Sequence, residues 1–349
     1  MSKYRQPTVT LLLGLLISST LFAAEAPSIR STQPGSYVVQ SGDTLWDIAE
    51  RFLLVPWRWP EIWHINPQVK NPHLIYPGDV IELSYVDGSP RLSLRRGSLV
   101  KLSPRVRIDQ LDTAIPAIPI SAIQQFLSRP QVLDQDALDN APYIVSFGEE
   151  HVIGSNNIKA YVRALTSEVP IHFDVVRPGK AYHDGESGEI LGYEARYLGS
   201  AELLQTGDPA SVILADMELE FLAGDRLVPE SREASRSSFI PKSPDQSIQG
   251  SIISVLNGVS QIGQYNIVVL DRGQRDGLSP GHVLTIKRHG LVVRDTVSPI
   301  SGTMVKLPDE PAGTLLVFRV FERVSFGLVM RATHAMHVGD RVSNPDLSY

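Results

Sequence analysis

No cysteine occurs anywhere in the 349 residues of the chain. This absence excludes disulfides, thiolate metal sites, a cysteine nucleophile and a lipidated N-terminal cysteine. A protein without disulfides can still be stable outside the cytoplasm if its core is large enough. The length allows two or three domains, and 42% of the residues are hydrophobic, so such a core is feasible.

Recognisable catalytic motifs are also lacking. The sequence contains no P-loop, no dinucleotide-binding glycine pattern and no His-Glu-x-x-His zinc motif. The closest histidine pair, His334 and His337, has neither a third ligand nor a neighbouring glutamate. Ser98 and Lys101 have the spacing of a penicillin-recognising acyltransferase, but the Lys-Thr-Gly partner motif is missing. We therefore predict no catalytic residue, no metal site, no cofactor and no enzymatic activity.

An excess of positive charge is absent as well. The chain has 32 lysines and arginines against 38 aspartates and glutamates, for a formal net charge of −6. A protein that binds nucleic acid or anionic membranes through its overall field would carry the opposite sign. We expect no nucleic-acid partner.

The N-terminus has the pattern of a secretory signal peptide. Lys3 and Arg5 precede an apolar run over residues 9–22, and small residues such as Ala23 and Ala24 follow. The run is shorter than the roughly 20 apolar residues of a membrane span, although an uncleaved anchor is the alternative. We expect residues 1–24 to be removed, which leaves a more acidic periplasmic protein with no stable membrane anchor.

Residues 36–85 have the most informative pattern in the chain. Residues 37–39 and 80–83 are typical of short strands, and apolar residues recur at helical spacing from Leu45 to Phe52. Asp43 or Thr44 can cap this helix, and Pro60 suits the first turn of a second helix. The predicted order is strand, helix, helix, strand.

This order and its motifs resemble the LysM module. The matching motifs are Tyr-Val-Val at 37–39, Ser-Gly-Asp-Thr-Leu-Trp at 41–46, Ile-Ala at 48–49, Asn-Pro at 66–67 and Ile-Tyr-Pro-Gly-Asp-Val-Ile at 75–81. The resemblance implies binding of N-acetylglucosamine-containing glycan, in bacteria the backbone of peptidoglycan. It also implies a shallow groove with Gly42, Asp43, Thr44 and Leu45 on one wall, and Leu74, Ile75 and Tyr76 on the other.

All four tryptophans lie in this stretch. Trp46 and Trp63 occupy apolar helix positions and are predicted to be core residues. Trp57 and Trp59 belong to an unusually long and aromatic connection between the helices. They either stack on sugar rings or pack in the inter-helix corner and against the following domain, and the second interpretation is favoured.

The remainder of the chain is rich in predicted strands. Short helices are expected at 120–126 and 135–139. Two sequence blocks, 190–229 and 311–345, end on the same pattern, Gly224-Asp225-Arg226-Leu227 and Gly339-Asp340-Arg341-Val342, which indicates a degenerate duplication. The strands expected in the first block and before it are 143–147, 151–153, 160–164, 172–176, 193–198, 201–204 and 217–221.

We therefore predict an α+β protein. A small β-α-α-β LysM module is expected to precede a mainly-β region of two small β-domains that are related by duplication. The expected division is a signal peptide at 1–24, a tether at 25–35, the LysM module at 36–85, a connecting segment at 86–141, a β-rich domain at 142–229, a polar linker at 230–249 and a second β-rich domain at 250–345.

The function expected from this organisation is non-catalytic cell-wall binding. The LysM groove would hold peptidoglycan glycan strands, while residues 142–345 bind an envelope protein partner or build an assembly. The alternative is a peptidoglycan-remodelling hydrolase whose catalytic region has no recognisable motif. A papain-like wall hydrolase is excluded because the chain has no cysteine.

Overall fold

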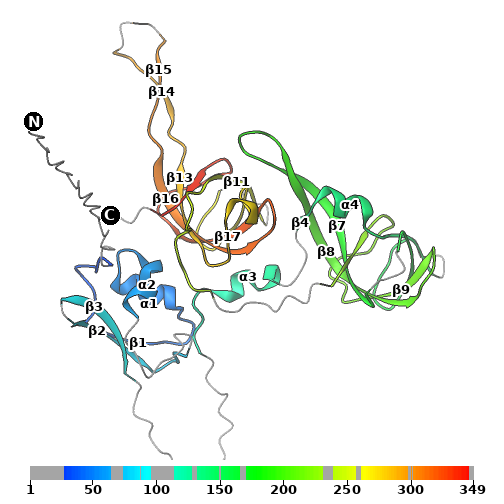
Figure 1. The fold of residues 1–349 in the computed structure, drawn as a ribbon, viewed down its shortest axis with the longest axis horizontal. Coiled ribbons are helices and arrows are strands. Elements are labelled where there is room, and N and C mark those ends of the chain that lie inside the picture. The colour runs from blue at the N-terminus through cyan, green and yellow to red at the C-terminus, as the bar shows by residue number, and fades with distance from the viewer. Residues whose placement is uncertain are drawn as a thin grey trace, which may run out of the picture.

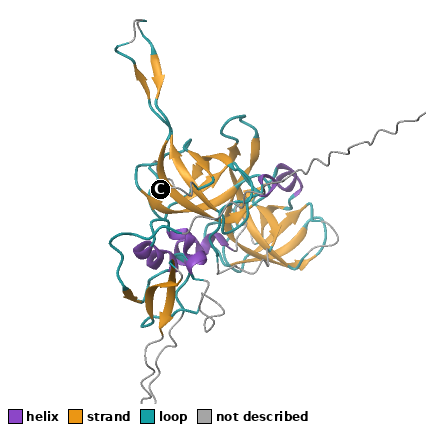
Figure 2. Ribbon diagram, turned by 60° about the vertical axis from the view of Figure 1, so that its left-hand side comes forward, coloured by secondary structure: helices purple, strands orange, loops and turns teal. Residues whose placement is uncertain are grey.

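The protein consists of an N-terminal module followed by two strand-rich domains (Figure 1). This computed structural model describes residues 27–63, 74–86, 88–95, 114–127, 132–148, 151–165, 170–230, 239–256, 261–297, 300 and 302–345. The predicted signal peptide therefore lies outside the described residues. Within them, no helix is long and apolar enough to cross a membrane. Within the described residues, the α-helices are short and lie before residue 141, and strands predominate in the remainder (Figure 2).

The N-terminal module has the predicted β-α-α-β order. The strand β2 (Val80–Val86) pairs on one side with β1 (Ser36–Val38) and on the other with an additional strand, β3 (Ser89–Arg95). The apolar residues of α1 (Leu45–Phe52) recur every three or four positions and are buried against this sheet, as the pattern predicted. The connection contains η1 (Pro56–Arg58) and α2 (Trp59–Ile62). The Asn66-Pro67 motif lies outside the described residues.

The first strand-rich domain is a ring of six strands. A seventh strand, β4 (Val132–Leu133), is added to one of them, and the pairing of β8 with β9 closes the ring in the order β8-β7-β10-β5-β6-β9. The short helix α4 (Gln135–Asn140) follows β4. The ring strands are β5 (Tyr143–Phe147), β6 (Lys159–Arg163), β7 (His172–His183), β8 (Ile190–Gln205), β9 (Ala210–Ala215) and β10 (Arg226–Pro229).

Two strand predictions in this domain were wrong, and two others belong to a single strand. Residues 193–198 and 201–204 are parts of one continuous strand, β8. Residues 217–221 form a turn after β9, because Asp216 adopts a left-handed φ of 49° and ends the strand. Residues 151–153 also form a turn, which ends in an isolated bridge between Gly154 and Phe221.

The second strand-rich domain is a closed six-stranded barrel in the order β11-β12-β17-β16-β13-β18. A hairpin formed by β14 (Val292–Arg294) and β15 (Met304–Lys306) projects from it (Figure 1). The single turn η2 (Gln274–Asp276) lies between β12 and β13. The barrel strands are β11 (Gln249–Val255), β12 (Ile267–Leu270), β13 (Val283–Arg288), β16 (Glu310–Val320), β17 (Ser325–Ala332) and β18 (Arg341–Ser343).

The two β-domains share one topology. If β5 to β10 are matched in chain order with the six barrel strands, every pairing in the first ring has its counterpart in the second. The duplication indicated by the sequence therefore extends over the whole six-stranded unit. Closure leaves neither ring with an open edge that could pair with another chain.

The repeated Gly-Asp step has the same geometry in both rings. Gly224 and Gly339 have φ values of 96° and 99°, a left-handed conformation that favours glycine. The carboxylate of the buried Asp225 accepts a hydrogen bond from the N–H of Leu222 at 2.6 Å, and Asp340 accepts one from the N–H of His337 at 2.8 Å. The repeated motif thus fixes the turn that starts the last strand of each ring.

One apolar cluster joins the N-terminal module, the barrel and the tip of the first β-domain. Trp46 and Trp57 of the module pack in this cluster with barrel residues such as Phe326 and with Tyr182 and Leu191 from β7 and β8. The helix α3 (Ile120–Leu127), close to its predicted position, lies beside the barrel (Figure 1) and contributes to the same cluster. The three parts of the protein are therefore joined by apolar packing as well as by the chain that links them.

Segments expected as a tether and a linker also contact folded parts. Arg30 Nε donates to the carbonyl of Leu53 at 2.9 Å. The N–H of Lys242 donates to the carbonyl of Gly281 at 3.0 Å.

We expect Asp340→Ala to lower the free energy of unfolding by roughly 1–3 kcal/mol, because the N–H of His337 and that of His289, which is 3.2 Å from Asp340 Oδ1, lose their acceptor. Asp340→Asn should cost less, since its amide oxygen still accepts one bond. Urea denaturation at pH 7 measures both. Equal stability of wild type and Asp340→Ala would contradict the structural role of this step.

Buried His282 should make stability depend on pH. Its Nδ1 lies 3.1 Å from the N–H of Ser279, and burial together with the charge of Lys242 lowers its pKa from 6.5. The unfolded chain then takes up the proton at a higher pH than the folded chain, so stability should fall as the pH drops below about 6.5. Thermal denaturation from pH 7.5 to 5 should show a smaller decrease for His282→Asn than for the wild type. Parallel curves would show that His282 does not contribute.

Candidate functional site

The first wall of the candidate groove is a turn that is fastened by Asp43. Its Oδ2 accepts hydrogen bonds from the N–H of Gln40 at 2.8 Å and from the hydroxyl of Tyr37 at 2.9 Å. Burial and this carboxylate raise the pKa of Tyr37. Gly42, at φ 94°, forms the exposed corner of the turn. The side chain of Asp43 is thus engaged within the protein.

Thr44 begins the helix α1 as its N-cap. Its Oγ1 lies 3.1 Å from the N–H of Asp47, while Asp47 Oδ2 accepts from the N–H of Thr44 at 3.2 Å, which completes a capping box. The cap fixes where α1 starts and leaves the first helical N–H groups, those of Leu45 and Trp46, without partners inside the helix. These groups face the candidate groove.

The second wall is a turn attached to β1. Asp79 Oδ2 accepts from the N–H of Tyr76 at 3.0 Å, and the N–H of Gly78 donates to the carbonyl of Val39 at 2.9 Å. The side chain of Leu74 is 43% exposed, whereas that of Ile75 is fully buried. The wall therefore presents one apolar side chain and backbone groups to its surroundings.

A segment of the same chain bridges the two walls. The N–H of Leu45 donates to the carbonyl of Pro116 at 2.9 Å, and the N–H of Trp46 donates to the carbonyl of Ala117 at 3.1 Å. On the opposite side the N–H of Ile115 donates to the carbonyl of Ile75 at 2.8 Å. Sequence reasoning missed this segment, although its Ile-Pro-Ala-Ile-Pro composition is typical of an apolar, extended chain.

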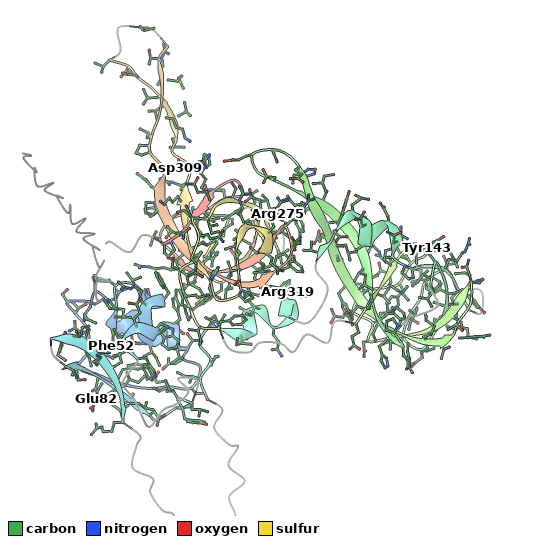
Figure 3. The ribbon with its side chains drawn as sticks, viewed as in Figure 1. Phe52, Glu82, Tyr143, Arg275, Asp309 and Arg319 are labelled. Atoms are coloured by element: carbon green, nitrogen blue, oxygen red, sulfur yellow. The ribbon has the colours of Figure 1, made fainter. Side chains whose placement is uncertain are left out.

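The structure brings the two predicted walls together on either side of this segment. Their predicted residues differ in accessibility: Gly42 and Leu74 are exposed, Asp43 and Tyr76 are half-buried, and the others are buried. Leu45 and Ile75 face the segment through backbone groups, because their side chains belong to the core of the module. Phe52, labelled in Figure 3, lies in that core.

The tryptophans are buried instead of lining the groove. Trp59 and Trp63 pack in the core of the module, with their rings at 89° and their centroids 6.3 Å apart. Trp46 and Trp57 belong to the cluster that joins the module to the barrel. The structure therefore agrees with the packing interpretation for Trp57 and Trp59.

Other polar groups of the described residues do not gather into a metal site. No group of three or more histidines, aspartates or glutamates there could hold an ion. In the histidine pair noted in the sequence, the backbone N–H of His337 donates to Asp340, and the side chain of His334 is exposed. Ser98 and Lys101 lie outside the described residues.

Comparison with protein families identifies residues 37–84 as a LysM domain. The protein thus carries a LysM domain followed by a β-rich region with a seven-stranded sheet and a six-stranded barrel. A LysM domain implies binding of peptidoglycan or chitin, and suggests an association with the cell wall. No curated protein matched the chain.

Trp57→Ala should lower the free energy of unfolding by about 3–5 kcal/mol, because the indole is only 6% exposed and fills the joint between module and barrel. Trp57→Phe should retain much of this stability. Urea denaturation followed by far-UV circular dichroism measures both variants. If Trp57→Ala instead abolished glycan binding at unchanged stability, sugar stacking would be the correct interpretation of this residue.

Proposed function

We propose that the protein is a non-catalytic cell-wall protein of the periplasm that holds the N-acetylglucosamine-containing glycan of peptidoglycan in the groove of its LysM domain. The observation that carries the proposal is the position of the two walls, Gly42–Leu45 and Leu74–Tyr76, within the family match at residues 37–84. Both are turns fixed by internal hydrogen bonds, so the walls themselves are preorganised.

The chemistry of the walls suits a neutral sugar chain. The N–H groups of Leu45 and Trp46 are of the donor type that an acetamide carbonyl requires, and the carbonyl of Ile75 is of the acceptor type that an acetamide N–H requires. In this structure residues 115–117 use these groups. Leu74 offers an apolar surface to a sugar ring. The one charged wall residue, Asp43, already accepts two hydrogen bonds inside the turn. The walls thus carry a single charged side chain, and its Oδ2 holds the turn together.

We propose that the β-rich region contributes binding or assembly instead of chemistry. A cavity of about 380 Å³ lies where the β7–β8 hairpin meets the barrel. Its charged groups are paired: Lys180 Nζ donates to Ser254 Oγ at 2.7 Å, Asp184 lies 3.0 Å from Arg272, and Arg341 lies 3.4 Å from Glu186. The buried hydroxyl of Tyr182, which also lines the cavity, has no hydrogen-bond partner among the described residues. Charged side chains paired in this way support structure more readily than they support nucleophilic or acid–base catalysis.

The proposal is tested by co-sedimentation of the full-length protein with purified sacculi. Leu74→Asp places a charge on the exposed side of the second wall and should weaken pelleting at least about tenfold, since a buried, unpaired carboxylate opposes binding. Leu204→Asp is the matched control, because Leu204 is also exposed but lies on β8. Equal pelleting of wild type and both variants would contradict a role for the groove.

Point variants are preferable to removal of the module. Deleting residues 36–85 would also remove Trp46 and Trp57 and expose the barrel surface that they cover. Release of soluble muropeptides during prolonged incubation with sacculi would overturn the non-catalytic assignment and support the wall-remodelling alternative.

A further inference from the structure

The segment that bridges the two walls uses the same backbone groups that the proposed ligand requires. The first N–H groups of α1 have no partner inside the helix and would otherwise meet water or a ligand. Here the carbonyls of Pro116 and Ala117 accept from them, and the N–H of Ile115 occupies the carbonyl of Ile75. A peptide bond and the acetamide of N-acetylglucosamine are both amides, so the segment presents the same donor and acceptor types as the glycan.

Apolar burial holds the segment in place. Ile115 is 4% exposed and Ala117 is 1% exposed, and both pack in the core cluster of the module with Leu45 and Ile75. Ile118, next in the chain, faces the other way, into the cluster shared with the barrel. The segment is therefore clamped between the LysM domain and the barrel.

The sequence of the segment favours the shape that fits the groove. Proline restricts the preceding residue to an extended conformation, and here Pro116 follows Ile115 and Pro119 follows Ile118. Pro116 also has no N–H to satisfy, so its carbonyl pairs with the helix while no donor is left unpaired. The segment thus loses little conformational freedom when it enters the groove.

We propose that residues 114–118 close the glycan groove in cis, so that the LysM domain binds glycan only in molecules whose segment has left the groove. This inference rests on the proposed function, since it concerns regulation of the same site. The apparent dissociation constant of the glycan is then the intrinsic constant divided by the fraction of open molecules. Because the segment belongs to the same chain, it competes at high effective concentration.

The closing segment is coupled to the barrel through α3, which begins two residues after Ile118. Ile123 and Phe126 of α3 are buried in the cluster shared with the barrel. Arg319 Nη1 of β16 donates to the carbonyl of Phe126 at 2.6 Å, and Figure 3 shows Arg319 beside this helix. A partner that moves α3 away from the barrel would pull on the segment, which gives the β-rich region a way to control the groove.

The test compares three full-length proteins in calorimetric titrations with an N-acetylglucosamine hexamer. Ile115→Asp should evict the segment, because its carboxylate cannot remain in the apolar core of the module, and should bind the hexamer at least about tenfold more tightly than the wild type. Ala114→Asp carries the same charge change at the neighbouring, half-buried position and should bind like the wild type. Circular dichroism and thermal denaturation verify that both variants are folded.

The outcomes separate the two proposals. Equal affinity of wild type and Ile115→Asp, or weaker binding by a folded Ile115→Asp, would overturn the closure while leaving the proposed function in place. Absence of hexamer binding in all three proteins would remove the proposed function, and the closure with it.

A second measurement does not depend on the folding of Ile115→Asp. Because the chain has no cysteine, Ala114→Cys accepts an environment-sensitive dye at a single site. Saturating hexamer should shift the emission of this dye, since the segment must leave the groove. Unchanged emission at saturation would overturn the closure. The same label at Leu204→Cys on β8 is the control and should not respond.

Discussion

The apolar cluster around Trp46 and Trp57 is the interaction on which the arrangement of this protein depends. In this cluster, side chains from the LysM domain, from the helix α3 and from the tip of the β7–β8 hairpin pack against the barrel. Its aromatic rings come from parts of the chain more than 200 residues apart, so it fixes domain positions that no local signal encodes. The LysM domain is therefore held against the barrel instead of moving freely on a tether, and its groove lies within reach of residues 114–118 for the same reason.

The β-rich region achieves its stability by closure and repetition. Two rings with the same strand order end on the same Gly-Asp turn, in which a left-handed glycine and a buried carboxylate start the strand that closes the ring. A chain without cysteine must draw its stability from such packing and hydrogen bonds, and closed rings remove the unpaired edges that would invite aggregation. The rings differ mainly in their additions, which are the β14–β15 hairpin in one and the long β7–β8 hairpin in the other.

The parts of this structure that the sequence predicted are those with local causes. The helix start, predicted at Asp43 or Thr44 and found at Thr44, depends on nearby residues, and so do the helical spacing from Leu45 to Phe52 and the turn at Gly78. The resemblance to the LysM module rests on such local motifs. The duplication was visible because the Gly-Asp turn demands the same two residue types each time.

The remaining features depend on contacts between distant residues. Residues 217–221 have an alternating strand pattern, but their position is decided by Asp216 and by pairing across the ring. Packing was the favoured interpretation for Trp57, but its particular contact partners and the occupant of the groove could not be predicted, because a buried indole and an extended Ile-Pro segment are compatible with many partners. Their contact partners are determined only when the apolar clusters of the folded protein form.

The β14–β15 hairpin is attached to a barrel strand that also contacts α3. Three residues separate β13 from β14, three separate β15 from β16, and the hairpin projects beyond the barrel (Figure 1). The wall strand β16 carries the Arg319 contact to α3, and α3 lies only two residues beyond Ile118. The barrel strand that follows the hairpin in the chain is thus also the strand that contacts the helix next to residues 114–118.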